Sequence, residues 1–119
     1  MQIKAEAKLV RIFVGESDLL HHNPVYEKIV QEARKMNLAG ATVFRGIMGF
    51  GGTSKIHTAK ILRLSEDMPM VIEIVDEQEK IEDFLPVLNN IFEEANCGGL
   101  ITMEKAEIIK YVVANKNSG

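Results

Sequence analysis

Hydrophobic and polar residues alternate in four segments of the chain, and this alternation predicts four β-strands. The segments are residues 8–14, 41–47, 70–75 and a part of residues 100–111. β-Branched and aromatic residues fill them, as is typical of strands. Two stretches between them carry apolar residues at helical spacing and therefore predict two helices.

The first predicted helix begins at Asn23 and Pro24, after a polar segment, residues 15–23, that we expect to be a loop. Asn23 suits the N-cap position and Pro24 suits the first helical position, where its missing N–H costs nothing. Asn37 and Gly40 are suitable residues for the end of this helix.

The second predicted helix begins after Asp76, which we expect to cap it, and ends before a tight loop at residues 96–99. Pro86 lies inside it and removes one backbone hydrogen bond. The sequence therefore predicts a kink or a break near Glu82.

The predicted order is strand, helix, strand, long loop, strand, helix, strand, which is the α+β pattern of a ferredoxin-like βαββαβ domain. Such a domain has a four-stranded antiparallel sheet with both helices on one face. A chain of 119 residues suits a single domain, residues 1–119.

The predicted strands are apolar on both faces, although two helices can cover only one of them. An exposed apolar sheet face marks an interface, so the sequence predicts an oligomer. Arg11 and Glu73 interrupt this second face, and we expect them to pair between subunits. Its apolar residues are Leu9, Phe13, Val71 and Val75.

The composition excludes several classes of protein. With 46% apolar and 26% charged residues, the chain is neither disordered nor fibrous. No apolar stretch approaches the ~20 residues of a membrane-spanning helix, and the N-terminus has no apolar signal core. We expect a cytoplasmic protein. A pI near 5.6 and an aromatic content of 6% disfavour nucleic-acid binding.

The net charge of −3 is unevenly distributed, because residues 33–64 contain no acidic residue. An acid-free stretch in an acidic protein indicates a local anion site, although chance spacing of solvated lysines gives the same pattern. The basic residues of this stretch are Arg34, Lys35, Arg45, Lys55, Lys60 and Arg63.

Two glycine-containing sites are candidates for binding an anion. Residues 46–52 match neither the P-loop nor the dinucleotide-binding pattern, but their backbone N–H groups lie beside Arg45 and Lys55. Gly98 and Gly99 would let a phosphate approach the backbone closely. At both sites the glycines can equally serve only to form turns.

No set of residues indicates a catalytic centre or a metal site. His21 and His22 are adjacent, and adjacent histidines rarely present both nitrogens to one metal. Cys97 has no evident base and is expected to be a partly buried spectator thiol. We expect a protein that is not an enzyme and holds no tightly bound metal.

The motifs resemble those of the PII (GlnB-like) signalling proteins. The resemblance rests on residues 40–43 (GATV), 49–51 (GFG), 57–58 (HT) and 71–75 (VIEIV). The longer runs GESD, RGIMGFG and LRLSEDMP resemble more closely an uncharacterised PII-like family, domain of unknown function family 190.

This resemblance implies a homotrimer of ferredoxin-like subunits with adenine nucleotides bound in the clefts between them. It implies no obligatory cofactor and no enzymatic activity. Nucleotide occupancy would change the long loop after the second strand, and that loop would regulate a partner, for which a membrane-transport protein is suggested.

The resemblance also implies roles for individual residues. Thr42 matches a position that contacts adenine, and Lys110 matches a phosphate-binding arginine on the last strand. The loop base beside the phosphates is matched by Gly49, Phe50 and Gly51, and the phosphate-wrapping loop by Gly98 and Gly99. In a trimer, Arg45 and Lys55 could converge with these glycines on one anion.

Departures from the PII pattern favour a small nucleotide. Gly52 stands where those proteins have a basic residue, and the wrapping loop is shortened and lacks its basic residue. Fewer phosphate ligands favour AMP or ADP over ATP. The alternative is a metal-responsive or structural trimer of the same fold that binds no nucleotide.

Overall fold

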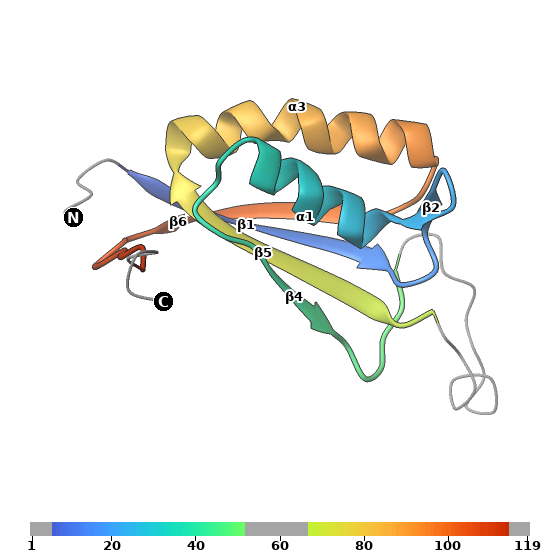
Figure 1. Cartoon of the computed structure of the whole chain (residues 1–119). Helices are drawn as coiled ribbons and strands as arrows, with labels where there is room; N and C mark the ends of the chain where they lie inside the picture. The colour runs from blue at the N-terminus through green and yellow to red at the C-terminus, as the bar shows by residue number, and fades with distance from the viewer. Residues whose placement is uncertain (1–5, 52–66, 115–119) are drawn as a thin grey trace.

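Two helices lie on one face of a four-stranded antiparallel sheet in the computed structural model, which describes residues 6–51 and 67–114 (Figure 1). The strand order β4-β5-β1-β6 confirms the predicted ferredoxin-like arrangement. The sheet consists of β1 (Ala7–Gly15), β4 (Thr42–Arg45), β5 (Pro69–Glu77) and β6 (Leu100–Ala106). The helices are α1 (Val25–Lys35) and α3 (Gln78–Ala95).

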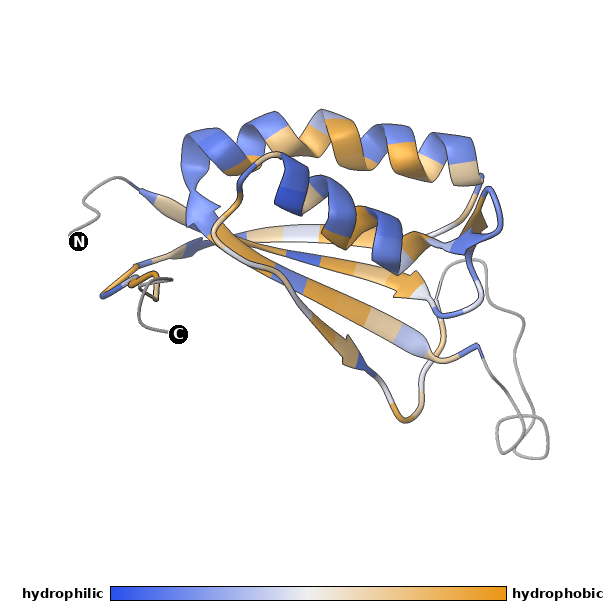
Figure 2. Ribbon diagram, in the orientation of Figure 1, coloured by the Kyte–Doolittle hydropathy of each residue, from blue (hydrophilic) through white to orange (hydrophobic). Residues whose placement is uncertain are grey.

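The core lies between the sheet and the helices. Ile12 of β1 stands opposite Ile72 of β5 and Ile101 of β6, and alternate residues along β1 and β5 are buried. Figure 2 shows hydrophobic runs along these strands and bands of hydrophobic and hydrophilic residues on both helices. The largest fully buried side chains are Phe84, Ile12, Ile29, Ile72, Ile74, Ile81, Leu88, Val10 and Val25.

The segment predicted as a loop between β1 and α1 contains a small hairpin. Its strands are β2 (Leu19–Leu20) and β3 (Asn23–Pro24), and His21 and His22 form the turn with φ angles of 50° and 71°. Because residues 23 and 24 belong to β3, the predicted cap at Asn23 is wrong. Pro24 occupies the N-cap position, and no side chain caps the helix.

The predicted cap at Asp76 is also wrong, because β5 continues to Glu77 and α3 begins at Gln78. The Asp76 carboxylate instead accepts hydrogen bonds from the backbone N–H of Glu77 at 2.7 Å and of Ala39 at 2.8 Å. It therefore joins β5 to the connection between α1 and β4.

The break predicted near Glu82 does not occur, because α3 runs without interruption from Gln78 to Ala95 (Figure 1). Proline removes only one hydrogen bond of the helix. Buried side chains before and after it, including Ile81, Phe84 and Leu88, hold both halves of the helix against the sheet. Packing therefore outweighs the cost of the missing bond.

We predict that Phe84→Ala lowers the free energy of unfolding by about 3–5 kcal/mol, because it leaves a cavity in the core. Phe50→Ala is the matched control, since the Phe84 side chain is 0% exposed and the Phe50 side chain is 82% exposed. The control should change stability by at most ~0.5 kcal/mol. Urea unfolding followed by circular dichroism at equal protein concentrations tests this. Equal losses in both variants would contradict the assigned core.

Candidate functional site

The sheet face opposite α1 and α3, here called the open face, presents its side chains in transverse rows. Phe13 stands opposite Val71 and Leu100, and Val71 stands opposite Phe44, so these four residues form an apolar row across all four strands. Phe44 is 51% and Leu100 is 55% exposed. The single chain therefore leaves a continuous apolar row accessible.

The next row is polar and contains Thr42, Glu73, Arg11 and Thr102. Arg11 Nε lies 2.8 Å from Glu73 Oε2, and Arg11 Nη1 lies 3.2 Å from Glu104 Oε2. The hydrogen bond that Arg11 donates to Glu73 is the main cause that raises the pKa of Arg11. The register places Arg11 and Glu73 opposite each other, so they pair within one chain, and their expected pairing between subunits stays a prediction.

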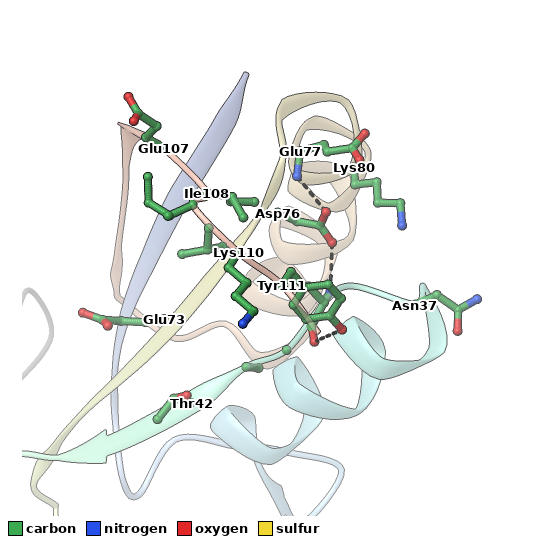
Figure 3. A pocket seen from close by; sticks show the side chains of 15 residues that line it. Asn37, Thr42, Glu73, Asp76, Glu77, Lys80, Glu107, Ile108, Lys110 and Tyr111 are labelled. Atoms are coloured by element: carbon green, nitrogen blue, oxygen red, sulfur yellow. Dashed lines mark hydrogen bonds between the residues drawn. The ribbon is translucent and has the colours of Figure 1, made fainter. Parts of the chain in front are cut away.

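A pocket of about 750 Å³ lies at the edge of the sheet where β4 begins (Figure 3). Residues of the connection 37–42, of β5 between 73 and 77, and of the segment 107–111 line it, together with Lys80 of α3. This volume is within the usual range for small-ligand sites. Segments from three distant parts of the sequence therefore converge on one cavity.

Two hydrogen-bonding side chains fix one wall of the pocket. Asp76 is buried and accepts the hydrogen bond from the Ala39 N–H described above, and the Tyr111 hydroxyl donates to the Ala39 carbonyl oxygen at 3.0 Å (Figure 3). Ala39 is thus held from both sides. Tyr111 makes the one hydrogen bond that joins residues 107–114 to the rest of the described chain.

The lining of the pocket combines apolar surface with a few polar groups. Val75, Ile108 and the ring of Tyr111 provide apolar surface, and Thr42 provides a hydroxyl. Lys110 reaches into the hollow between the C-terminal segment and β4 (Figure 3). Because carboxylates outnumber ammonium groups in the lining, the pocket suits a planar base or a sugar better than a polyphosphate.

At the far end of β4, Arg45 forms an ion pair with Glu16, which follows β1. Arg45 Nε lies 3.1 Å from Glu16 Oε1 and 3.0 Å from Glu16 Oε2. The hydrogen bond from Arg45 is the main cause that lowers the pKa of Glu16. The Gly46 N–H donates to the Pro69 carbonyl oxygen at 2.7 Å, so the glycine-rich segment starts close against β5.

The predicted site residues fall into separate groups in the single chain. Thr42 and Lys110 line the pocket, and Lys110 lies beyond the end of β6 and not on the strand as expected. Arg45 and the following glycine-rich segment, with Gly49, Phe50 and Gly51, lie at the other end of β4. Lys55 lies outside the described residues.

Gly98 and Gly99 form the turn from α3 to β6, next to the end of β1. A Cβ atom added at Gly99 would stand 2.7 Å from the Phe13 carbonyl oxygen, so close backbone packing requires a glycine here. Three inter-strand spacings of about 4.8 Å separate the edge strands β4 and β6. One chain therefore does not bring these glycines to Arg45.

Sequence reasoning missed Tyr111 and Glu16 as site residues, and assigned Asp76 only to a helix cap. The partners of these side chains lie 72, 29 and 37 residues away along the chain. Local patterns hold no signal for such pairs. The acid-free stretch of the sequence indicated Arg45 as a candidate, but not its partner Glu16.

The remaining candidate residues show no reactive arrangement. Burial is the main cause that raises the pKa of Cys97, which favours the thiol over the nucleophilic thiolate. His21 Nε2 lies 3.7 Å from Glu94 Oε2. Within residues 6–51 and 67–114, no three His, Cys, Asp or Glu side chains gather where they could hold a metal ion. No helix in that part of the chain is long and apolar enough to span a membrane.

Solved structures with the same fold are PII-like proteins. The nitrogen regulatory PII-like protein CPII of Thiomonas intermedia, bound to ADP, AMP and bicarbonate, matches with a TM-score of 0.66 and 13% identity, over 88% of this chain and 90% of that chain. A putative PII-like signalling protein of Thermus thermophilus matches with a TM-score of 0.61 and 17% identity, over 91% and 97%. These similarities confirm the predicted PII-like fold.

Sequence comparison finds relatives across most of the chain. A UPF0166 protein of Aquifex aeolicus is 40% identical over 102 residues, which are 86% of this chain and 92% of the relative. A UPF0166 protein of Methanocaldococcus jannaschii is 32% identical over 105 residues, 88% of this chain and 94% of the relative. Residues 7–108 match the model of domain of unknown function family 190, described as "Uncharacterized ACR", and the chain belongs to this family, as the motifs predicted.

Proposed function

We propose that the protein is a PII-like regulatory protein that binds an adenine nucleotide, AMP or ADP, and has no enzymatic activity. The observation that carries the proposal is the pocket beside Thr42 and Lys110. It offers an apolar surface, a hydroxyl and an ammonium group at one edge of a PII-like fold. ADP and AMP are bound in the CPII structure that shares this fold.

The nucleotide would place its base and sugar in the pocket and direct its phosphate along the outer edge of β4. Thr42 begins β4 and Arg45 ends it, so about 10 Å separates them along the strand. Arg45 and the backbone N–H groups of the glycine-rich segment would then meet the phosphate. Gly98 and Gly99 of a neighbouring subunit, together with Lys55, would complete this site.

We also propose a homotrimer in which the open faces pack together. Burying a side chain such as Phe44 or Leu100 contributes roughly 1.5–3 kcal/mol, so the apolar row alone favours assembly. Packing the sheets would bring Gly98 and Gly99 of one subunit near Arg45 of the next, which a single chain does not do. The nucleotide would then bind between subunits.

The partner in this proposal is a protein that senses the state of the segment between β4 and β5. Ile47, Met48 and Phe50 at the base of this segment are exposed and apolar, as residues of a protein contact often are. A membrane-transport protein reached from the cytoplasm is the partner that we favour. A pull-down with the wild-type protein, with and without AMP, tests this part of the proposal.

We predict that isothermal titration calorimetry detects binding of AMP and ADP, and that Lys110→Ala weakens binding at least about tenfold. The reason is the loss of a charge-assisted contact worth about 1.5–3 kcal/mol. Lys105→Ala is the matched control, because Lys105 is an exposed lysine of β6 that does not line the pocket. Unchanged affinity in Lys110→Ala, or equal losses in both variants, would contradict the assigned pocket.

We predict that light scattering gives a mass of three times 13.3 kDa for the wild-type protein, and that Val71→Asp shifts it to the monomer. A carboxylate in the middle of the apolar row would be buried without a partner. Leu19→Asp serves as control, since Leu19 is exposed on β2 and away from the open face. A wild-type monomer at micromolar concentration, or a trimeric Val71→Asp variant, would refute the proposed assembly.

A further inference from the structure

The ion pair of Glu16 and Arg45 uses only one of the three guanidinium nitrogens. Only Nε of the guanidinium contacts the carboxylate, and neither terminal amino group has a hydrogen-bond partner among the described residues. The Arg45 side chain is 52% exposed and that of Glu16 is 26% exposed. Both terminal amino groups of Arg45 are therefore available to an anion, while its Nε is occupied by Glu16.

Hydrogen bonds hold the backbone that carries the Glu16 side chain. The Glu16 N–H donates to the Met68 carbonyl oxygen at 2.8 Å, and the N–H of the next residue, Ser17, donates to Asp67 Oδ1 at 3.1 Å. Both acceptors directly precede β5, so the turn after β1 is tied to the sheet. A negative charge thus stays beside Arg45, and it repels any anion that approaches the free donors.

We infer that Glu16 is a specificity-determining residue that selects nucleotides by the charge of their phosphate groups. Arg45 attracts the first phosphate, whereas the fixed carboxylate repels every further negative charge. A monophosphate therefore gains the contact with Arg45 and carries the fewest charges that the carboxylate repels. A triphosphate meets more of it, so Glu16 favours AMP over ATP.

The strength of this discrimination follows from the distances. Two unit charges 4 Å apart interact by about 1 kcal/mol in water and about fourfold more near a protein surface, and ~1.4 kcal/mol corresponds to a tenfold change in affinity. The additional charges of a triphosphate lie farther from Glu16 than the first phosphate. They therefore feel less repulsion than the first phosphate, and a change of about twofold in the affinity ratio of ATP to AMP is expected when the carboxylate is neutralised.

Neutralising Glu16 leaves the rest of the contact intact. In Glu16→Gln the side-chain oxygen still accepts a hydrogen bond from Arg45 Nε, so the arginine stays in position. Glu32→Gln is the matched control, because Glu32 pairs with Lys28 and Lys35 within α1 and removes the same charge elsewhere. An exposed pair contributes only about 0–1 kcal/mol to stability, so both variants should fold.

The test is calorimetric titration of the wild-type protein, Glu16→Gln and Glu32→Gln with AMP, ADP and ATP, without divalent cations. For Glu16→Gln we expect about fivefold tighter binding of AMP and about tenfold tighter binding of ATP, with ADP between them, at low salt. The gain in affinity of Glu16→Gln over the wild-type protein should shrink at 0.5 M salt, because ions screen the carboxylate. If Glu16 had only a structural role, this gain would not depend on salt. Glu32→Gln should bind all three as the wild-type protein does.

The inference rests on the proposed nucleotide binding, and the outcomes separate the two. If the wild-type protein binds AMP but Glu16→Gln leaves the ratio of ATP to AMP affinity unchanged, the inference about Glu16 is wrong and the proposed function stands. The same holds if Glu32→Gln changes the ratio equally. If the folded wild-type protein and Glu16→Gln bind none of the three at millimolar concentration, both are wrong.

Discussion

The position of β1 between β5 and β6 is the constraint on which the rest of the structure depends. Its antiparallel register pairs Ile12 with Ile72 and Ile101 on the helix side, and Phe13 with Val71 and Leu100 on the open face. A shift by one residue would exchange the two faces. The register therefore decides at once what forms the core, which residues stay exposed, and why Arg11 meets Glu73 in the same chain.

The buried carboxylate of Asp76 links this fold to the pocket. It stands at the end of β5 and binds the N–H of Ala39, while Tyr111 binds the carbonyl oxygen of the same residue. A buried carboxylate without such donors would be costly, so the connection 37–41 is fixed as part of the folded state. The pocket wall is consequently built into the fold and does not depend on a ligand for its shape.

The distribution of the candidate residues favours a site that needs more than one subunit. Thr42 and Lys110 share the pocket, Arg45 lies at the other end of β4, and Gly99 lies beside the opposite edge of the sheet. Packing of the exposed apolar row would bring opposite edges of neighbouring sheets together. The same row thus connects assembly with ligand binding, and this connection is the physical basis of the proposed regulation.

The sequence by itself determined the four strands of the main sheet, the two helices, their order and the family. The alternation of residues such as Val10, Ile12 and Val14 indicates which side of a strand is apolar. Motifs such as RGIMGFG are contiguous in the sequence, so they can be recognised without the structure. The ends of the elements were predicted less well. Asn23 belongs to β3 and does not cap α1, and β5 extends past Asp76. Packing of Phe84 and Leu88 keeps α3 continuous across Pro86. Only the tertiary structure decided the pairs Glu16–Arg45, Ala39–Asp76 and Ala39–Tyr111, because such contacts depend on how distant segments meet and leave no periodic signal in the chain.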